Sequence, residues 1–214
     1  WTIFLAAKPS TATSGRVLLY IGGDNQVNKP YIEVRLTSAG KLRFHIGTDT
    51  NFLRWTSGSA LGTIWQALQI SYNGLRTGNN PSDLNTYFAN LDIKINGISW
   101  AGNWVAGQNG WANAIVISKV FLGKPYNNVG YASGERIQHF AVWDSDERTN
   151  AAAYAATPQV DFNSVTNKPV HWFPLGDYAT FPTYADISTN PTNGTTDIVQ
   201  AYNMVSSNIV TDAR

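Results

Sequence analysis

Apolar and polar residues alternate along most of the first three quarters of the chain, in short runs separated by Gly, Asn, Ser and Pro. An apolar side chain at every second position is the pattern of a β-strand with one buried face. The pattern predicts strands over residues 1–9, 16–23, 31–37, 41–48, 64–74, 91–97, 114–123 and 136–143. Residues 48–63 read as polar and turn-like, without a strand of their own.

The clearest alternation covers residues 31–48, where two runs are joined by Ser-Ala-Gly. Such a pair predicts an antiparallel hairpin with one buried and one wet face. The wet face carries Glu33, Arg35, Lys41, Arg43 and His45.

Residues 135–157 join a strand to a more helical stretch and organise the rest of the chain. His139 and Trp143 lie on one face of the predicted strand, and Phe140 and Val142 lie on the opposite face. Because apolar residues occur on both faces, we expect other parts of the protein to cover both faces of this strand. Because His139 shares its face with apolar residues, we expect a hydrogen-bonded core histidine there.

A short helix is predicted directly after this strand. Asp144 stands where an N-cap belongs, and Glu147 follows three residues later to complete a capping box. The alanine-rich run 151–156 has high helix propensity and stops before Pro158.

The elements together predict an all-β fold, an antiparallel β-sandwich over residues 1–157 with one short late helix. The remaining residues, 158–214, are punctuated by prolines and yet rich in apolar side chains. They are interpreted as an extended C-terminal arm that packs either on its own sandwich or on a neighbouring subunit.

Composition narrows the function. The chain has 214 residues, a net charge of +1 and no cysteine, so disulfides and thiolate metal sites are excluded and no electrostatic footprint for nucleic acid or an anionic membrane is visible. It holds 8 Trp, 10 Tyr and 9 Phe against only 14 % charged residues. That balance suits a sugar-binding or protein-packing surface, or else the aromatics fill the core.

Signals for catalysis are weak, and no enzyme activity is predicted. A glycosidase needs two carboxylates facing one cleft, but the chain holds three glutamates in all, and helix initiation already explains Asp144 and Asp146. The three histidines form no metal-ligand pattern, and no nucleophile elbow or phosphate loop is present. No cofactor is predicted. A calcium ion bound by the loop oxygens of Asp24, Asn25 and Asn28 is an alternative hypothesis.

The best binding candidate in the sequence is a glycan platform in the loops around residues 99–112. Aromatic rings stack on sugar rings while Asn side chains bond the hydroxyls. The candidate residues are Trp100, Trp104, Asn109, Trp111 and Tyr126. The alternative is that these tryptophans plug one end of the sandwich or pack on a partner.

In its order of strands the chain resembles laminin-G-like domains of the concanavalin A type, through the segments WTIFLAAKP, GRVLLYIGG, YIEVRLTSAGKLRFHIG, IWQALQISYNG, LDIKINGISW, ISKVFLG and ERIQHFAVWDSDERTNAAAYA. The resemblance implies a jelly roll over about residues 1–157. The Glu-x-Asp-x-x-Glu strand of that family's glycosidase branch is missing, which implies the non-catalytic branch.

A second resemblance concerns the arm. The segment HWFPLGDYATFP…NMVSSNIVTD is similar to stretches that follow such domains in structural proteins of tailed bacteriophages. It implies a decorating or tail component on the virion surface, a homo-oligomer in contact with other virion proteins. Host-surface or environmental glycans are further partners that this resemblance suggests. The alternative is an extracellular carbohydrate-binding lectin module.

Overall fold

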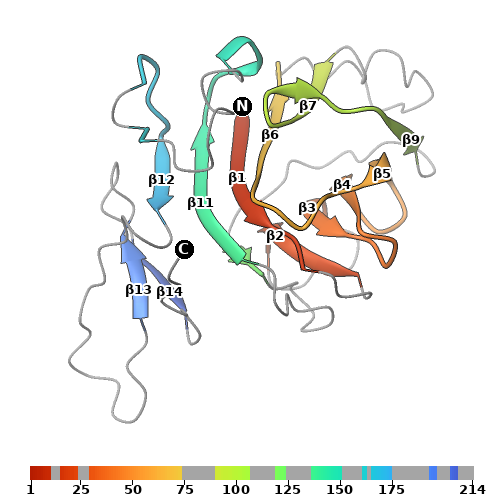
Figure 1. The fold of residues 1–214 in the computed structure, drawn as a ribbon, viewed down its shortest axis with the longest axis horizontal. Helices are drawn as coiled ribbons and strands as arrows, with labels where there is room; N and C mark the ends of the chain where they lie inside the picture. Colours follow the sequence, from red (N-terminus) through yellow and green to blue (C-terminus); the bar gives the residue numbers. More distant parts are fainter. Residues whose placement is uncertain are drawn as a thin grey trace.

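A computed structural model shows an antiparallel β-sandwich built from two sheets (Figure 1). It describes residues 1–10, 15–23, 29–73, 90–106, 119–123, 136–150, 161–162, 165–174, 193–196 and 203–206. The predicted all-β sandwich class is therefore confirmed.

Each sheet has six strands in the described part of the chain. The first sheet has the order β12 (His171–Pro174), β11 (Arg136–Trp143), β1 (Thr2–Lys8), β6 (Gln66–Tyr72), β7 (Leu91–Ile95), β8 (Ile98–Ser99). The second sheet has the order β10 (Lys119–Leu122), β2 (Arg16–Gly22), β3 (Tyr31–Leu36), β4 (Lys41–Gly47), β5 (Phe52–Ala60), β9 (Gly102–Ala106). A separate two-stranded hairpin is formed by β13 (Asn193–Thr196) and β14 (Asn203–Ser206).

The main core lies between the two sheets and is built by the alternation read from the sequence. Every second side chain of each strand points inward, among them Leu5, Leu19, Val34, Phe44, Leu53, Leu68, Ile93 and Phe140. Burying one such aliphatic or aromatic side chain contributes roughly 1.5–3 kcal/mol. The core therefore fixes the register of each strand, because a slip by one residue would expose its whole apolar face.

A second apolar cluster covers the outer side of the first sheet. Phe4 and Trp143 point outward there and meet Phe162 and Trp172, with Phe162 edge-on to the other three rings. The expectation that β11 is covered on both faces is thus confirmed. Residues 161–162 and 165–174 of the C-terminal arm pack on the sandwich of their own chain and add β12 to the sheet. The division of the chain at residue 157 stays a prediction.

His139 is a core histidine, as the sequence predicts. It is fully buried, and Trp172 donates its indole N–H to His139 Nδ1 at 3.3 Å. Burial lowers the pKa of His139 to about 4, so the ring is neutral at ordinary pH.

A β-bulge interrupts the pairing of β11 with β1. It leaves Gln138 without a register partner on β1, which shifts Ile137 to the face that meets the main core.

The predicted capping box between Asp144 and Glu147 is wrong. The Glu147 amide donates instead to Thr2 Oγ1 at 2.8 Å, and the Glu147 carboxylate accepts from Ser145 Oγ and Asn150 Nδ2. The turn that follows is a three-residue 3-10 helix, η1 (Arg148–Asn150). A tertiary acceptor on β1 has replaced the local N-cap. The alanine-rich run 151–156 lies outside the described residues.

Two segments expected to be irregular form strands. Residues 48–63 contain β5, and the tryptophan-rich loop region contains β8 and β9. The inward-facing residues of β5 are Leu53, Trp55 and Ser57. Because Ser57 is small and polar, the apolar alternation stops in the middle of the strand. In β9 the glycine and asparagine that suggest a loop lie at an edge of the sheet, where a strand needs few apolar residues.

The described residues contain no helix long and apolar enough to cross a membrane.

Candidate functional site

The predicted glycan platform is described only in part. Trp100 and Trp104 are half-buried and pack against the main core. Asn109, Trp111 and Tyr126 lie outside the described residues, as do Asp24, Asn25 and Asn28 of the calcium hypothesis. Within the described ranges no three His, Asp or Glu side chains gather as a metal site would require. The platform stays a prediction.

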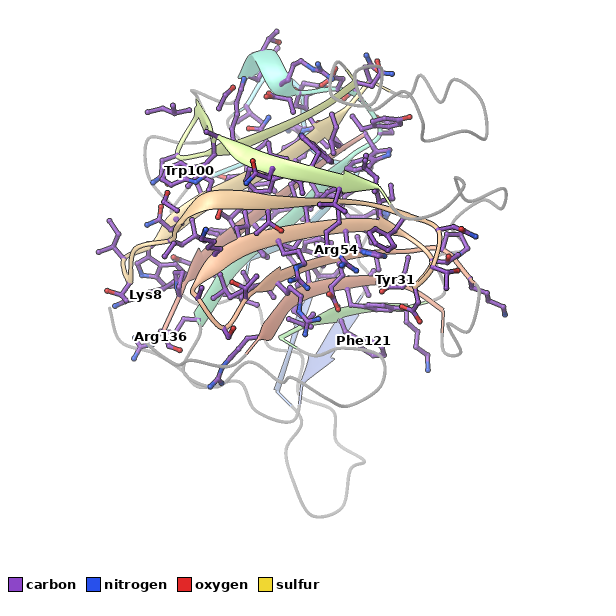
Figure 2. All side chains as sticks on the ribbon, turned by 90° about the vertical axis from the view of Figure 1, so that its right-hand side faces the viewer. Lys8, Tyr31, Arg54, Trp100, Phe121 and Arg136 are labelled. Carbon is purple, nitrogen blue, oxygen red and sulfur yellow. The ribbon has the colours of Figure 1, made fainter. Side chains whose placement is uncertain are left out.

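A different concentration of functional side chains lies on the outer face of the second sheet. Strand pairing sets one residue from each of five adjacent strands in a row there: Phe121, Tyr20, Glu33, His45 and Arg54. Tyr31 and Phe52 lie on one side of this row, and Arg35 and Arg43 on the other. These nine residues are named the aromatic–arginine face, and Figure 2 labels Tyr31, Arg54 and Phe121 over the strands that carry it.

Five rings cross this face in an unbroken ladder from β10 to β5. The ring centroids are 6.1 Å apart for Phe121 and Tyr20, and 5.4 Å apart for Tyr20 and Tyr31. The ladder continues from Tyr31 to His45 at 4.6 Å, and from His45 to Phe52 at 5.2 Å. Aromatic pairs at these separations stabilise a sheet across its strands by about 0.2–1 kcal/mol each.

A glycine makes room for the ladder. A Cβ on Gly22 would lie 2.6 Å from the Tyr20 hydroxyl oxygen and 3.0 Å from Tyr31 Cβ. Because real side chains do not approach so closely, Gly22 permits the two tyrosines to stack. The Tyr31 hydroxyl then donates to Asp49 Oδ1 at 2.9 Å, which fixes the far end of the ring.

Three arginines border the ladder. The Arg54 guanidinium carbon lies 4.2 Å above the Phe52 ring, a cation–π contact, and Arg54 Nη2 approaches His45 Nδ1 at 3.5 Å. Arg35 Nη1 is 3.4 Å from Glu33 Oε1. Arg43 lies directly opposite Arg35 across the β3–β4 pair.

Burial and charge shape the electrostatics of this face. Burial raises the pKa of Glu33, opposed by the positive charges of Arg35 and Arg43. Burial, followed by the neighbouring cations Arg54 and Arg35, lowers the pKa of Arg43. Burial and then Arg54 lower the pKa of His45 to about 3, so this ring is neutral and carries none of the positive charge.

The residues of this face differ in their exposure to solvent. Tyr20, Tyr31 and His45 are 0 %, 7 % and 2 % exposed, so the middle of the ladder is structural. The side chains left half-buried are Arg35, Arg43, Phe52, Arg54 and Phe121. The accessible part of the face therefore consists of guanidinium groups and the edges of two aromatic rings.

The sequence carries part of this signal. The alternation over 31–48 places Glu33, Arg35, Arg43 and His45 on one face, and the structure confirms that placement. The sequence predicts that Glu33 and His45 are exposed to solvent, but the structure buries both side chains. The rings of Tyr31 and Phe52 pack against His45. The contribution of β10 and β5 depends on which strands are neighbours, which local patterns do not reveal.

Comparison with known proteins supports the β-sandwich fold. No protein-family model and no curated protein matches the chain. Among solved structures, a native heptameric SAP-like pentraxin from Limulus polyphemus matches with a TM-score of 0.50 and 11 % identity, over 98 % of this chain and 80 % of that chain. At this identity the likeness concerns the fold alone.

A carbohydrate-binding module is also similar. The CBM40 module of the Ruminococcus gnavus IT-sialidase matches with a TM-score of 0.47 and 14 % identity, over 73 % of this chain and 82 % of that chain. The same module bound to alpha2,3 sialyllactose matches with a TM-score of 0.47 and 15 % identity, over 72 % of this chain and 82 % of the other.

Proposed function

We propose that this protein is a non-enzymatic, lectin-like carbohydrate-binding module that uses the aromatic–arginine face. The observation that carries the proposal is the contrast between the two outer sheet faces. The arm segment 161–174 covers the first sheet with its own aromatic rings. The second sheet instead keeps half-buried aromatic and guanidinium groups in register at its outer surface.

The chemistry of this face suits sugars. The half-buried rings of Phe52 and Phe121 offer apolar edges to pyranose rings. The guanidinium groups offer several N–H donors each to ring hydroxyls and acidic substituents. Because the buried tyrosines and His45 fix the strands beneath, these groups are held in place before a ligand arrives, which lowers the entropic cost of binding.

A glycan array with the whole protein tests the proposal. We expect binding that Phe52→Ala weakens by about tenfold or more, as loss of one aromatic contact of 1.4 kcal/mol would. Trp111→Ala serves as the comparison, because Trp111 belongs to the platform predicted from sequence. Loss of binding only in Trp111→Ala would move the site to that platform, and an array without any bound glycan would overturn the function.

The virion role rests on the sequence resemblance of the arm to bacteriophage structural proteins. In the structure β12 joins the sandwich, whereas β13 and β14 form a hairpin of their own beside it (Figure 1). As a second candidate function, residues beyond 174 anchor the chain in a homo-oligomer on a particle. Removing residues 175–214 should then abolish the oligomer in sedimentation while the sandwich stays folded, and an intact oligomer would count against it.

A further inference from the structure

The aromatic–arginine face carries more positive charge than its neighbouring carboxylates neutralise. Arg35, Arg43 and Arg54 bring three guanidinium groups, and the described acidic groups near them are Glu33 on the face and Asp49 at its border. Asp49 is already engaged by the Tyr31 hydroxyl at 2.9 Å. Among the residues that the structure describes, Glu33 is the carboxylate within the aromatic–arginine face, and it pairs with Arg35 at 3.4 Å.

One contact on this face is unfavourable by itself. Arg35 and Arg43 are direct cross-strand partners, and like charges in that position destabilise a sheet. On its other side Arg43 faces Thr56, which supplies no negative charge. Glu33 offsets part of this repulsion through its contact with Arg35, and the positive charge that remains is expected where a sequence serves binding instead of stability.

The same three arginines have unused hydrogen-bonding capacity. In the described part of the chain, the Nε atoms of Arg35, Arg43 and Arg54 are buried without a hydrogen-bond partner. Their side chains are nevertheless half-buried overall, so other parts of each side chain reach the surface. Guanidinium groups bind carboxylates and sulfate-like oxyanions through paired N–H donors, and such charge-assisted bonds are the strong ones.

We propose that Arg35, Arg43 and Arg54 form an anion-binding subsite whose ligand is a carbohydrate bearing carboxylate or sulfate groups. This deepens the proposed carbohydrate-binding function and rests on it. Arg54 is stacked on Phe52, so an acidic substituent bound to the guanidinium groups brings its sugar ring beside an aromatic edge. Arg43 is the central cation, because its strand β4 lies between β3 with Arg35 and β5 with Arg54.

Calorimetric titration of the whole protein with matched sugars tests this subsite. Oligogalacturonides and their methyl esters share the same rings and differ in carboxylate charge, and a sulfated dextran oligosaccharide tests the second acidic group. We expect the acid to bind at least about tenfold more tightly than the ester, and its affinity to fall as salt is raised. Arg43→Gln should remove about tenfold or more of that affinity, as loss of one charge-assisted bond does.

The matched control is Lys8→Ala, which removes one positive charge from β1 in the other sheet, away from Tyr31 and Arg54 in Figure 2. It should leave the affinity unchanged. The melting temperature of Arg43→Gln should stay level or rise, because the like-charge pair with Arg35 is gone. A purely structural arginine would instead lower it.

The outcomes separate the two proposals. Equal affinity for acid and ester, or full affinity in Arg43→Gln, would overturn the subsite while leaving carbohydrate binding intact. Absence of binding to every sugar tested, on the array and by titration, would overturn both. Equally tight binding of polyglutamate would show a dock for acidic peptides and would also overturn the acidic-sugar subsite.

Discussion

Gly102, at the start of β9, lies where any side chain would collide with the core. A Cβ there would run into the indole ring of Trp55 and would lie 2.6 Å from the Thr56 carbonyl oxygen. We expect Gly102→Ala to lower the free energy of unfolding by about 1–3 kcal/mol, the usual cost of overpacking. Denaturant titration measures this.

Gly58 on the adjacent strand provides the control for that substitution. Its nearest neighbour to an added Cβ is the Ala101 carbonyl oxygen, at an ordinary 3.5 Å. Gly58→Ala should therefore change stability by no more than about 0.5 kcal/mol, as most surface substitutions do. Equal effects at both positions would contradict the packing argument.

His139 makes stability depend on pH. Its pKa is lowered to about 4 in the folded protein, against 6.5 for an ordinary histidine. The unfolded chain therefore binds the extra proton first, so stability is full above about pH 6.5 and falls as the pH drops toward 4. The difference between the two pKa values corresponds to roughly 3 kcal/mol.

The variant His139→Gln keeps an acceptor for the Trp172 indole and removes the titrating ring. Its free energy of unfolding should fall less steeply than that of the wild type between pH 6.5 and 4. His45, with its own pKa lowered to about 3, keeps part of the slope in both proteins. Parallel stability curves across this range would refute the assignment to His139.

At the scale of the secondary-structure elements, the Thr2 hydroxyl connects β1 to the residue that precedes the η1 turn. Thr2 is fully buried, accepts from the Glu147 amide at 2.8 Å and lies 3.0 Å from Ser71 Oγ. Thr2→Val keeps the shape and leaves that amide without its acceptor. We expect a loss of about 1–3 kcal/mol, and faster amide hydrogen exchange at residues 147–150.

Thr56→Val is the corresponding control, since Thr56 is half-buried on the outer face of β5. It should alter neither stability nor exchange around η1. If Thr2→Val left the Glu147 amide as protected as in the wild type, the hydroxyl would not be what holds the turn to the sheet.

The sequence allowed most strands to be predicted, because their alternation reflects the sandwich core directly. β3 and β4 are the best examples, where every inward position is large and apolar. β5 was missed because Ser57 and Gly58 follow Trp55 and end the alternation early. The capping box failed because the partner of the Glu147 amide comes from Thr2, a residue far away in sequence.

For the molecule as a whole, the first part of the arm belongs structurally to the sandwich. Phe162 and Trp172 bury the outward rings of Phe4 and Trp143. Removing residues 158–214 should therefore cost several kcal/mol, because each buried aromatic lost costs about 3–5 kcal/mol. Removing only 175–214 should leave the melting temperature nearly unchanged, and thermal melts of the two truncations compare them.

Similar melting temperatures for both truncations would show that segment 161–174 contributes little to the fold.

The candidate site is also a property of the whole molecule, since Phe121 reaches the ladder only because β10 pairs with β2. Such a pairing between distant segments has no local pattern in the sequence, and for that reason the aromatic–arginine face was only partly predictable.

The position of β1 also determines the order in which the protein can assemble during synthesis. β1 lies between β6 and β11, although it is synthesised before both of them (Figure 1). The meander β2–β5 can form from neighbouring segments, whereas β1 must wait for residues 136–143. Because contacts this distant slow folding, one edge of the apolar strand β1 stays unpaired until residues 136–143 have been synthesised, and chaperones that capture exposed strands can bind it during that interval.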